Sequence, residues 1–243
     1  MSTDFLLPAK RKRKFLLDLV VASSGRDGDL LIAGDNDLAL FFLLVELMDR
    51  VDSGLFVFFL LADFETGVNP DWEIFAQNGG NMSFNVTSNN SPQGNSYYDM
   101  GGNVDWDWLI GLVDFPATAY GNSTFDLNDN GARVYFNVML NMPQGLDNPP
   151  IVLLQFREDD NNNGVFEEGL EDMYAIEIRD LEPGWQLVSL KYSDLASLVN
   201  GAPVDADGNG VHNPDLLNKV SVLMLAQQGG GYSQTLMDYV IFT

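Results

Sequence analysis

The chain has 243 residues, 46% of them hydrophobic, which is enough for the core of one domain with or without an extension. Its formal charge of −23 at pH 7 argues against nucleic acid, anionic membranes and acidic polysaccharides as partners, and leaves divalent cations and neutral ligands. The chain contains no cysteine, which excludes disulfides and thiolate chemistry, and its one histidine, His212, argues against a histidine-based catalytic triad or zinc site.

Residues 1–61 differ in composition from the rest of the chain. They contain a basic run, Lys10–Lys14, followed by the apolar run Phe15–Ala22, which is the outline of a secretion signal. The later apolar runs are far shorter than the roughly 20 residues of a membrane-spanning helix, so we expect no transmembrane segment. This extension is then a targeting segment, an edge-covering element, an assembly strand for self-association, or an upstream remnant.

Residues 62–243 consist of short strand-like runs separated by turns rich in Asn, Gly, Asp and Pro. In one run Val134, Phe136, Val138 and Leu140 alternate with more polar residues, as in a strand with one buried face. This spacing predicts an all-β domain, an antiparallel β-sandwich over 62–243, with a short helix at Ser193–Val199. The clearest predicted strands are 83–87, 132–140, 151–156, 173–178, 185–190, 220–225 and 239–242.

A motif with acidic or amide side chains at positions 1, 3 and 5 and glycine at position 6 occurs three times, at 126–131, 159–164 and 205–210. These residue types at this spacing begin a Ca²⁺-binding loop, although no copy has the Glu at position 12 that an EF-hand needs. The first copy precedes a strand and is interpreted as a turn. The alternative for all three is an ordinary Asn- and Gly-rich turn. The candidate Ca²⁺ ligands in the second copy are Asp159, Asn161 and Asn163, completed by Glu168 or by one of Glu167, Glu171 and Asp172. Those in the third copy are Asp205, Asp207 and Asn209.

A group of aromatic residues lies close together in sequence among Gly, Asn and Asp. Trp106 and Trp108 share one face of a strand, and Asp105 and Asp107 share the other. Planar rings with a few polar partners form sugar-binding sites, but both Trp side chains fit a core equally well. The candidate ligand-binding residues are therefore Tyr97, Tyr98, Asp105, Trp106, Asp107, Trp108 and Tyr120.

Three segments of the domain, in this order and spacing, resemble the galactose-binding-like jelly rolls that occur as carbohydrate-binding modules in bacterial surface and secreted proteins. They are 63–72, 184–195 and 237–242. The resemblance implies a jelly roll with Trp72 and Trp185 in the core. It also implies a structural Ca²⁺ held by Glu65 near the start of the domain and Asp238 in the last strand.

These observations together predict a non-catalytic, Ca²⁺-stabilised module, extracellular or on a cell surface, that binds a neutral oligo- or polysaccharide. A structural or assembly subunit of a surface layer or filament is the alternative. A jelly-roll enzyme acting on glycans is a weaker alternative, because no compact motif isolates the pair of carboxylates that glycoside hydrolysis uses.

Overall fold

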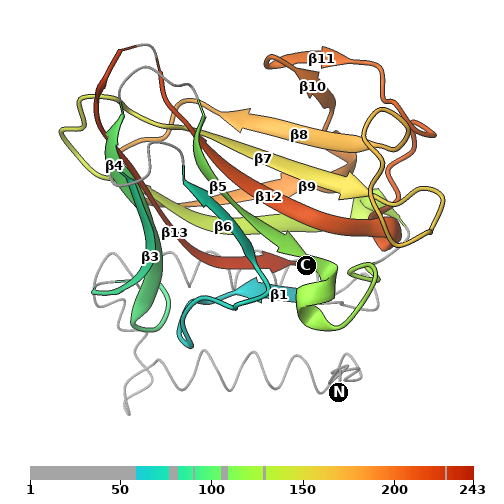
Figure 1. The fold of residues 1–243 in the computed structure, drawn as a ribbon, viewed down its shortest axis with the longest axis horizontal. Coiled ribbons are helices and arrows are strands. Elements are labelled where there is room, and N and C mark those ends of the chain that lie inside the picture. Colours follow the sequence, from blue (N-terminus) through green and yellow to red (C-terminus); the bar gives the residue numbers. More distant parts are fainter. Residues whose placement is uncertain (1–58, 77–81, 90, 105–108, 128–129, 228) are drawn as a thin grey trace, which may run out of the picture.

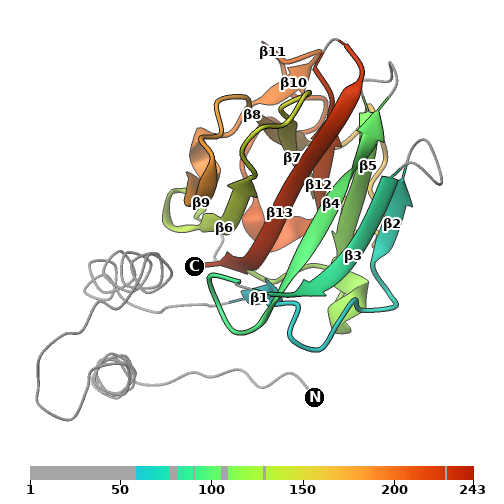
Figure 2. The same ribbon diagram turned by 90° about the vertical axis from the view of Figure 1, so that its left-hand side faces the viewer.

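In a computed structural model, the described part of the chain comprises residues 59–76, 82–89, 91–104, 109–127, 130–227 and 229–243. It forms two antiparallel sheets packed face to face, which confirms the predicted β-sandwich (Figures 1 and 2). Among these residues, no helix combines the length and hydrophobicity that crossing a bilayer requires. The remainder of the predicted extension, residues 1–58, lies outside the described residues.

The first sheet, sheet A, has the strand order β3-β4-β13-β6-β9, and β1 also pairs with β13. Its strands are β1 (Phe59–Ala62), β3 (Met82–Ser88), β4 (Ser96–Val104), β6 (Tyr135–Met142), β9 (Gly184–Lys191) and β13 (Gly231–Phe242). The pairing of β1 with β13, in which Phe59 lies opposite Phe242, joins the beginning of the domain to its end. β1 starts three residues before the predicted domain boundary at residue 62.

The second sheet, sheet B, has the order β2-β5-β12-β7-β8, and a separate hairpin joins β10 to β11. Its strands are β2 (Glu73–Ala76), β5 (Leu109–Pro116), β12 (Leu217–Leu225), β7 (Ile151–Glu158) and β8 (Met173–Ile178). The hairpin strands are β10 (Ser197–Val199) and β11 (Ala202–Val204). The segment predicted as a helix, Ser193–Val199, instead holds the end of a 3-10 turn, Tyr192–Asp194, and then β10. That prediction was wrong because β10 pairs with β11, and this pairing outweighs a weak local helix preference.

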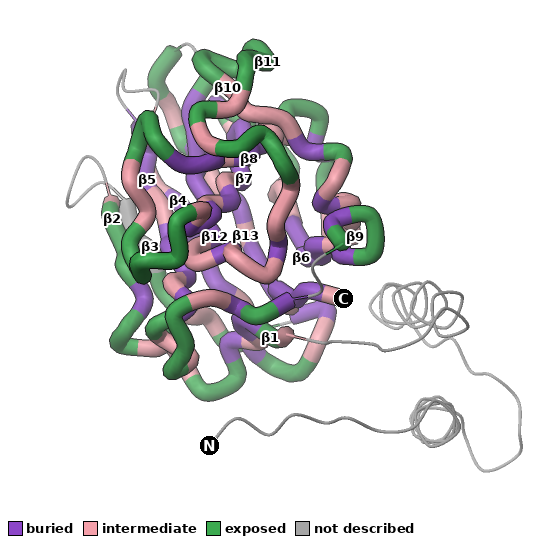
Figure 3. The backbone as a smooth tube through the Cα atoms, turned by 90° about the vertical axis from the view of Figure 1, so that its right-hand side faces the viewer, coloured by how far each residue is buried: buried purple, intermediate pink, exposed green. Residues whose placement is uncertain are grey.

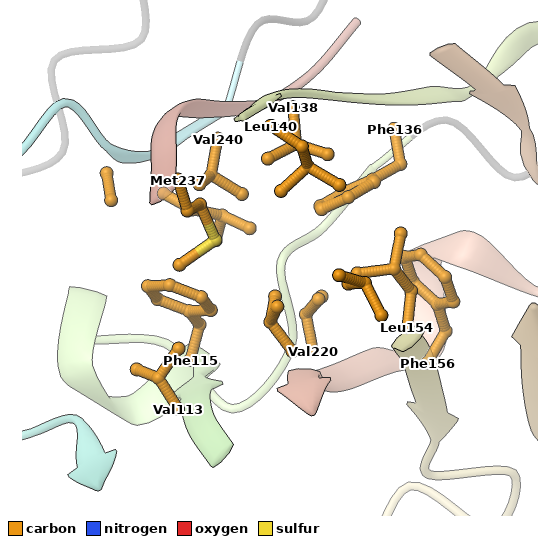
Figure 4. Packing of buried hydrophobic residues seen from close by; sticks show 14 of the residues in the cluster. Val113, Phe115, Phe136, Val138, Leu140, Leu154, Phe156, Val220, Met237 and Val240 are labelled. Carbon is orange, nitrogen blue, oxygen red and sulfur yellow. The ribbon is translucent and has the colours of Figure 1, made fainter. Parts of the chain in front are cut away.

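Each sheet turns alternate side chains toward the space between the layers. On β6, Phe136, Val138 and Leu140 are fully buried in this core, as the alternation of the sequence predicts. Opposite them lie Leu154 and Phe156 of β7 and Val220 of β12 (Figure 4). Burial follows the strands, and exposure follows the connecting loops (Figure 3).

The strand β13 contains an irregularity that matters for the site described below. Its register with β6 shifts between Asp238 and Ile241, and Tyr239 has a φ of 49°, an uncommon value for a residue other than glycine. An extra residue at this point, as in a β-bulge, changes the directions in which the neighbouring side chains point. Asp238 is fully buried as a result.

The ring of Phe242 contacts the rings of Phe125, Phe136 and Phe156, with centroids 5.9, 5.3 and 6.3 Å away. We expect Phe242→Ala to lower the free energy of unfolding by about 3–5 kcal/mol, because it leaves a cavity where both sheets meet. Leu170→Ala is the control, since Leu170 is 68% exposed and its loss should cost no more than about 0.5 kcal/mol. Urea unfolding measures both values, and equal midpoints for the two variants would contradict this packing.

Candidate functional site

A cleft of about 560 Å³ opens on the outer face of sheet B. Four of its strands contribute polar side chains at neighbouring register positions, because every second residue of a strand points away from the core. The acidic loop, defined as residues 158–172 between β7 and β8, supplies the wall through residues 164–166 and 168. The polar residues that line the sheet side are Glu73, Asp114, Gln155, Arg157, Asn218 and Lys219.

The side chains in this sheet B cleft are bound to one another. The Arg157 guanidinium donates to Ser221 Oγ at 2.7 Å and to Gln155 Oε1 at 3.2 Å. It also lies 5.8 Å from the centroid of the Phe166 ring. The Lys219 ammonium lies 3.0 Å from a Glu73 oxygen and 3.4 Å from Asp114 Oδ2. The cleft therefore presents fixed donors and acceptors beside one aromatic ring.

Asp114 stands out within the cleft. Its side chain is 8% exposed, and its Oδ1 has no hydrogen-bond partner in the described part of the chain. A buried acceptor without a partner costs free energy, and the ion pairs of Asp114 with Arg157 and Lys219 offset this cost.

The terminal junction is the place where Glu65, which follows β1, approaches Asp238 of β13. Both carboxylates bind the segment 93–96: Glu65 accepts from the backbone N–H groups of Asn95 and Ser96, each at 2.7 Å, and Asp238 accepts from that of Gln93 at 3.2 Å. The bonds from Asn95 and Ser96 lower the pKa of Glu65.

Burial raises the pKa of Asp238 to about 7, and the charges of Glu65 and Asp63 add to this effect. The side-chain oxygen of Gln93 is also buried and has no partner among the described residues. Carboxylate and amide oxygens are the ligand types that a hard cation takes, although the oxygens of Asp63, Glu65 and Asp238 do not form a group as close as the triad described next. The predicted pair, Glu65 and Asp238, is thus brought together, and it remains a proposal as a metal site.

A second group of acids, the acidic triad, consists of Glu158, Asp160 and Asp172. One carboxylate oxygen from each lies within 4.8 Å of the others. Burial raises the pKa of Glu158 to about 8, and the charges of Asp160 and Asp172 contribute. These three residues can hold a metal ion.

The triad differs from the ligands predicted in the acidic loop. The Asp159 carboxylate accepts from the backbone N–H groups of Asn163 and Gly164, and the side-chain oxygens of Asn161 and Asn163 also accept backbone N–H groups. Glu168 is exposed. Of the triad, sequence reasoning named only Asp172, as one of four acids that could complete the site. It missed Glu158 and Asp160, which lie next to the motif positions, because only the folded loop brings Glu158 and Asp172 together.

The third motif lies in the glycine loop, defined as residues 205–213. Asp205 and Asp207 are exposed, whereas the Asn209 side chain donates to Asp160 and accepts from the backbone of Val211. The glycine loop therefore touches the triad, but through N–H groups rather than through its predicted oxygen ligands.

The predicted aromatic residues lie in different places. Tyr98 is fully buried and stacks on Phe64, so its prediction as a sugar contact was wrong. Tyr120 is partly buried, and its hydroxyl donates to the Leu61 carbonyl at 2.8 Å and accepts from Trp72 Nε1 at 3.1 Å. Trp72 is in the core, as predicted. Asp105, Trp106, Asp107 and Trp108 lie outside the described residues, and their role stays a prediction.

Tyr97 and Trp185 form a pair on sheet A. Tyr97 is half-buried on β4, and its ring meets that of Trp185 on β9 edge to face at 5.8 Å. Trp185 is half-buried and lies outside the core cluster that holds Trp72, so its predicted place in the core was wrong. The reason is the strand register. Trp185 lies opposite Asn141 of β6, and the residue that faces the core is the one before Asn141, Leu140, so Trp185 is on the outer side of the sheet.

No protein-family model matches this sequence, and no curated protein matches it in sequence. Solved structures do share its fold. A family 11 carbohydrate-binding module from Clostridium thermocellum, in complex with a β-1,3-1,4-mixed-linked tetrasaccharide, is similar with a TM-score of 0.51 at 12% identity, over 76% of this chain and 94% of that one.

A family 30 carbohydrate-binding module of a Clostridium thermocellum cellulosomal cellulase gives a TM-score of 0.50 at 15% identity, over 77% of this chain and 98% of that one. The chain thus has the jelly-roll β-sandwich fold of carbohydrate-binding modules, as its sequence resemblance implied. At these identities the likeness shows the fold alone.

We expect Tyr120→Phe to lower the free energy of unfolding by about 1–3 kcal/mol, because it leaves the Leu61 carbonyl and the Trp72 indole N–H without their partner. Urea unfolding measures this loss, and Tyr232→Phe, at an exposed tyrosine, is the control. A variant of unchanged stability but weakened carbohydrate binding would restore Tyr120 to the ligand site.

Proposed function

We propose that this chain is a non-catalytic glycan-binding module of a secreted or cell-surface protein, and that the sheet B cleft takes a neutral oligo- or polysaccharide. The observation that carries the proposal is the cleft itself, with its fixed polar groups and one aromatic ring. Its volume lies in the range of about 300–1,000 Å³ typical of small-ligand sites. The fold shared with carbohydrate-binding modules supports the same function.

The polar groups of the cleft suit sugar hydroxyls. Each hydroxyl both donates and accepts, so it can pair with the amides of Gln155 and Asn218. The Phe166 ring offers an apolar face for the C–H side of a pyranose. Such a site orients its ligand through several modest hydrogen bonds rather than through one strong charge.

The charges of the cleft favour a neutral ligand. Residues 62–243 contain five basic residues, Arg133, Arg157, Arg179, Lys191 and Lys219, and two of them lie in the cleft. Both already have carboxylates beside them, Asp114 at 3.6 Å from Arg157 and Glu73 at 3.0 Å from Lys219. Since the exposed Glu168 adds another negative charge, an acidic polysaccharide would gain little.

The same ion pairs argue for binding rather than hydrolysis. A glycosidase needs one protonated carboxylic acid as its proton donor. Hydrolysis also needs a second carboxylate that faces the bond to be cleaved, whereas the carboxylates of Glu73 and Asp114 both face the Lys219 ammonium, at 3.0 and 3.4 Å.

We expect Gln155→Ala with Arg157→Ala to weaken glycan binding about tenfold or more, because two or more hydrogen bonds of the cleft are lost. Affinity electrophoresis in gels that contain neutral polysaccharides, after a glycan array has found the ligand, measures the change. Trp185→Ala, on the other sheet, is the matched control and should bind as the wild type does. Loss of binding in Trp185→Ala alone would move the site to the outer face of sheet A, beside Tyr97.

We further propose Ca²⁺ as the ion of the terminal junction, where it would neutralise Glu65 and Asp238 and join β1 to β13. Removing Ca²⁺ with a chelator is then expected to lower the unfolding temperature by about 5–10 °C, relative to Ca²⁺ at about 100 times its Kd. Asp238→Asn should shrink this difference, and Asp71→Asn, at an exposed acid, should leave it intact. Scanning calorimetry measures it, and an Asp238→Asn variant with the full wild-type shift would refute the junction as an ion site.

A further inference from the structure

The acidic loop and the glycine loop, which are widely separated in sequence, meet around the acidic triad. Glycine-loop N–H groups bind all three carboxylates: Gly208 and Gly210 donate to Asp172 at 2.8 and 2.7 Å, and Asn213 donates to Glu158 at 2.7 Å. The Asn209 side chain donates to Asp160.

Close approach of the two loops depends on glycine. A Cβ atom at Gly208 would lie 2.7 Å from the backbone nitrogen of Asp172 and would also overlap the Asp160 carboxylate. The glycine loop is thus drawn against the triad more closely than other residues would allow.

Glu158 supplies the observation that points to a ligand. It is fully buried, and its Oε1 accepts from the Tyr192 hydroxyl at 2.8 Å and from the Asn213 N–H. Its Oε2 is buried without any partner in the described part of the chain. A buried carboxylate oxygen with no donor, next to two further carboxylates, lacks the positive charge that would compensate it.

The spacing of the triad oxygens suits Ca²⁺. Oxygens that bind one Ca²⁺ ion can lie up to about 4.6–5.2 Å apart, and Ca²⁺ accepts six to eight oxygen ligands in flexible geometry, whereas Mg²⁺ is usually held by one or two carboxylates and keeps several waters. The triad oxygens lie within 4.8 Å of one another. Zn²⁺ prefers nitrogen and sulfur ligands, and the ring nitrogen of His212 is bound to the Leu195 carbonyl at 3.0 Å.

The triad also lies beside the proposed glycan site. Glu158 and Asp172 are the two ends of the acidic loop, and Gly164, Val165, Phe166 and Glu168 in the middle of the same loop form a wall of the sheet B cleft. An ion that fixes the ends of the loop therefore limits the positions that its middle can take.

We propose that Glu158, Asp160 and Asp172 bind a Ca²⁺ ion, separate from the terminal junction, which clamps the acidic loop to the glycine loop and so holds the cleft wall in its glycan-binding position. The second half of this proposal rests on the proposed function, whereas the ion site stands on the triad alone. Because coupling between two sites is reciprocal, bound glycan should tighten Ca²⁺ binding by the same factor.

The ion site is tested with Glu158→Gln combined with Asp160→Asn, which keeps shape and removes two charges. Equilibrium dialysis with Ca²⁺ should show one ion fewer per chain than in the wild type. Terbium luminescence excited through tyrosine should fall as well, because the Tyr192 and Tyr174 hydroxyls bind Glu158 and Asp172. Asp238→Asn is the matched control and should keep the part of this luminescence that the double variant loses.

If the triad only supported the loops internally, the double variant would be less stable than the wild type even without an ion. The proposal instead predicts that, in chelator, the double variant unfolds at or above the wild-type temperature, because it relieves repulsion among the carboxylates. Such a result also shows that the variant folds. Cleavage by a glutamate-specific protease after Glu167 and Glu168 should be slowed several-fold by Ca²⁺ in the wild type and not in the variant. If the variant binds as many ions as the wild type, or is protected to the same degree, the ion site is refuted.

The link to the cleft is measured as glycan affinity with and without Ca²⁺. We expect chelation to weaken binding about tenfold in the wild type and in Asp238→Asn, and to have no effect in the double variant. Affinity that is independent of Ca²⁺ in the wild type would refute the link. If no glycan binds the wild type, the proposed function fails and the link with it, while the dialysis result still decides the ion site.

Discussion

The loops of this sandwich depend on buried carboxylates that backbone N–H groups bind. Glu158, Asp159, Asp172 and Asp238 are all fully buried. Each accepts at least one backbone N–H, and none takes part in the ion pairs found among the described residues. Moving a charged group out of water costs several kcal/mol, and hydrogen bonds to a charged group return only about 1.5–3 kcal/mol each. These loops therefore hold their shape only while the donors stay in place.

This constraint explains the composition of the loops. A carboxylate can accept several backbone N–H groups only where the chain turns tightly around it, and Asn and Gly favour such turns. The repeated motif serves this purpose in the acidic loop, where Asp159 accepts from residues four and five positions further on. The first copy ends close to the glycine loop as well: a Cβ at Gly131 would lie 3.1 Å from the Cβ of His212. The first and third copies thus approach each other around Tyr192 and His212, and Tyr192 also binds Glu158, the residue before the second copy.

The fold could be predicted from the sequence more fully than the site. In a strand with one apolar face, such as the strand of Val138 and Leu140, every second residue is apolar, and this pattern predicts which side is buried. The structure confirms that prediction for both residues. The β10 strand was missed because three residues carry too little pattern, and tertiary pairing decides their conformation. Trp185 was misplaced because the resemblance alone assigned it to the core, and its strand, which is half-buried throughout, has no apolar pattern that could have corrected the assignment.

The cleft had a signal in the sequence that was not used. Gln155 and Arg157 are alternate residues at the end of an apolar strand, and Lys219 and Ser221 are alternate residues in the strand paired with it. Polar residues at every second position near the ends of two apolar strands indicate that the outer face of the sheet is exposed to solvent there. For the triad, the density of acids between Glu158 and Asp172 indicated the loop but not the three residues, because the fold alone closes the 14-residue separation between Glu158 and Asp172.

The shortage of basic residues decides how this chain can balance its buried acids. Arg157 and Lys219 are engaged in the cleft, and Arg179 pairs with Glu177. Extracellular Ca²⁺ modules work with dissociation constants of about 10⁻⁴–10⁻³ M, since the surrounding concentration is high. A weak site therefore suffices where the ion is abundant, and the loops need no lysine or arginine side chain ordered inside them. Under the proposed Ca²⁺ binding, the charge that compensates the acidic loop comes from solution rather than from the chain, so the loop would respond to the Ca²⁺ concentration around it.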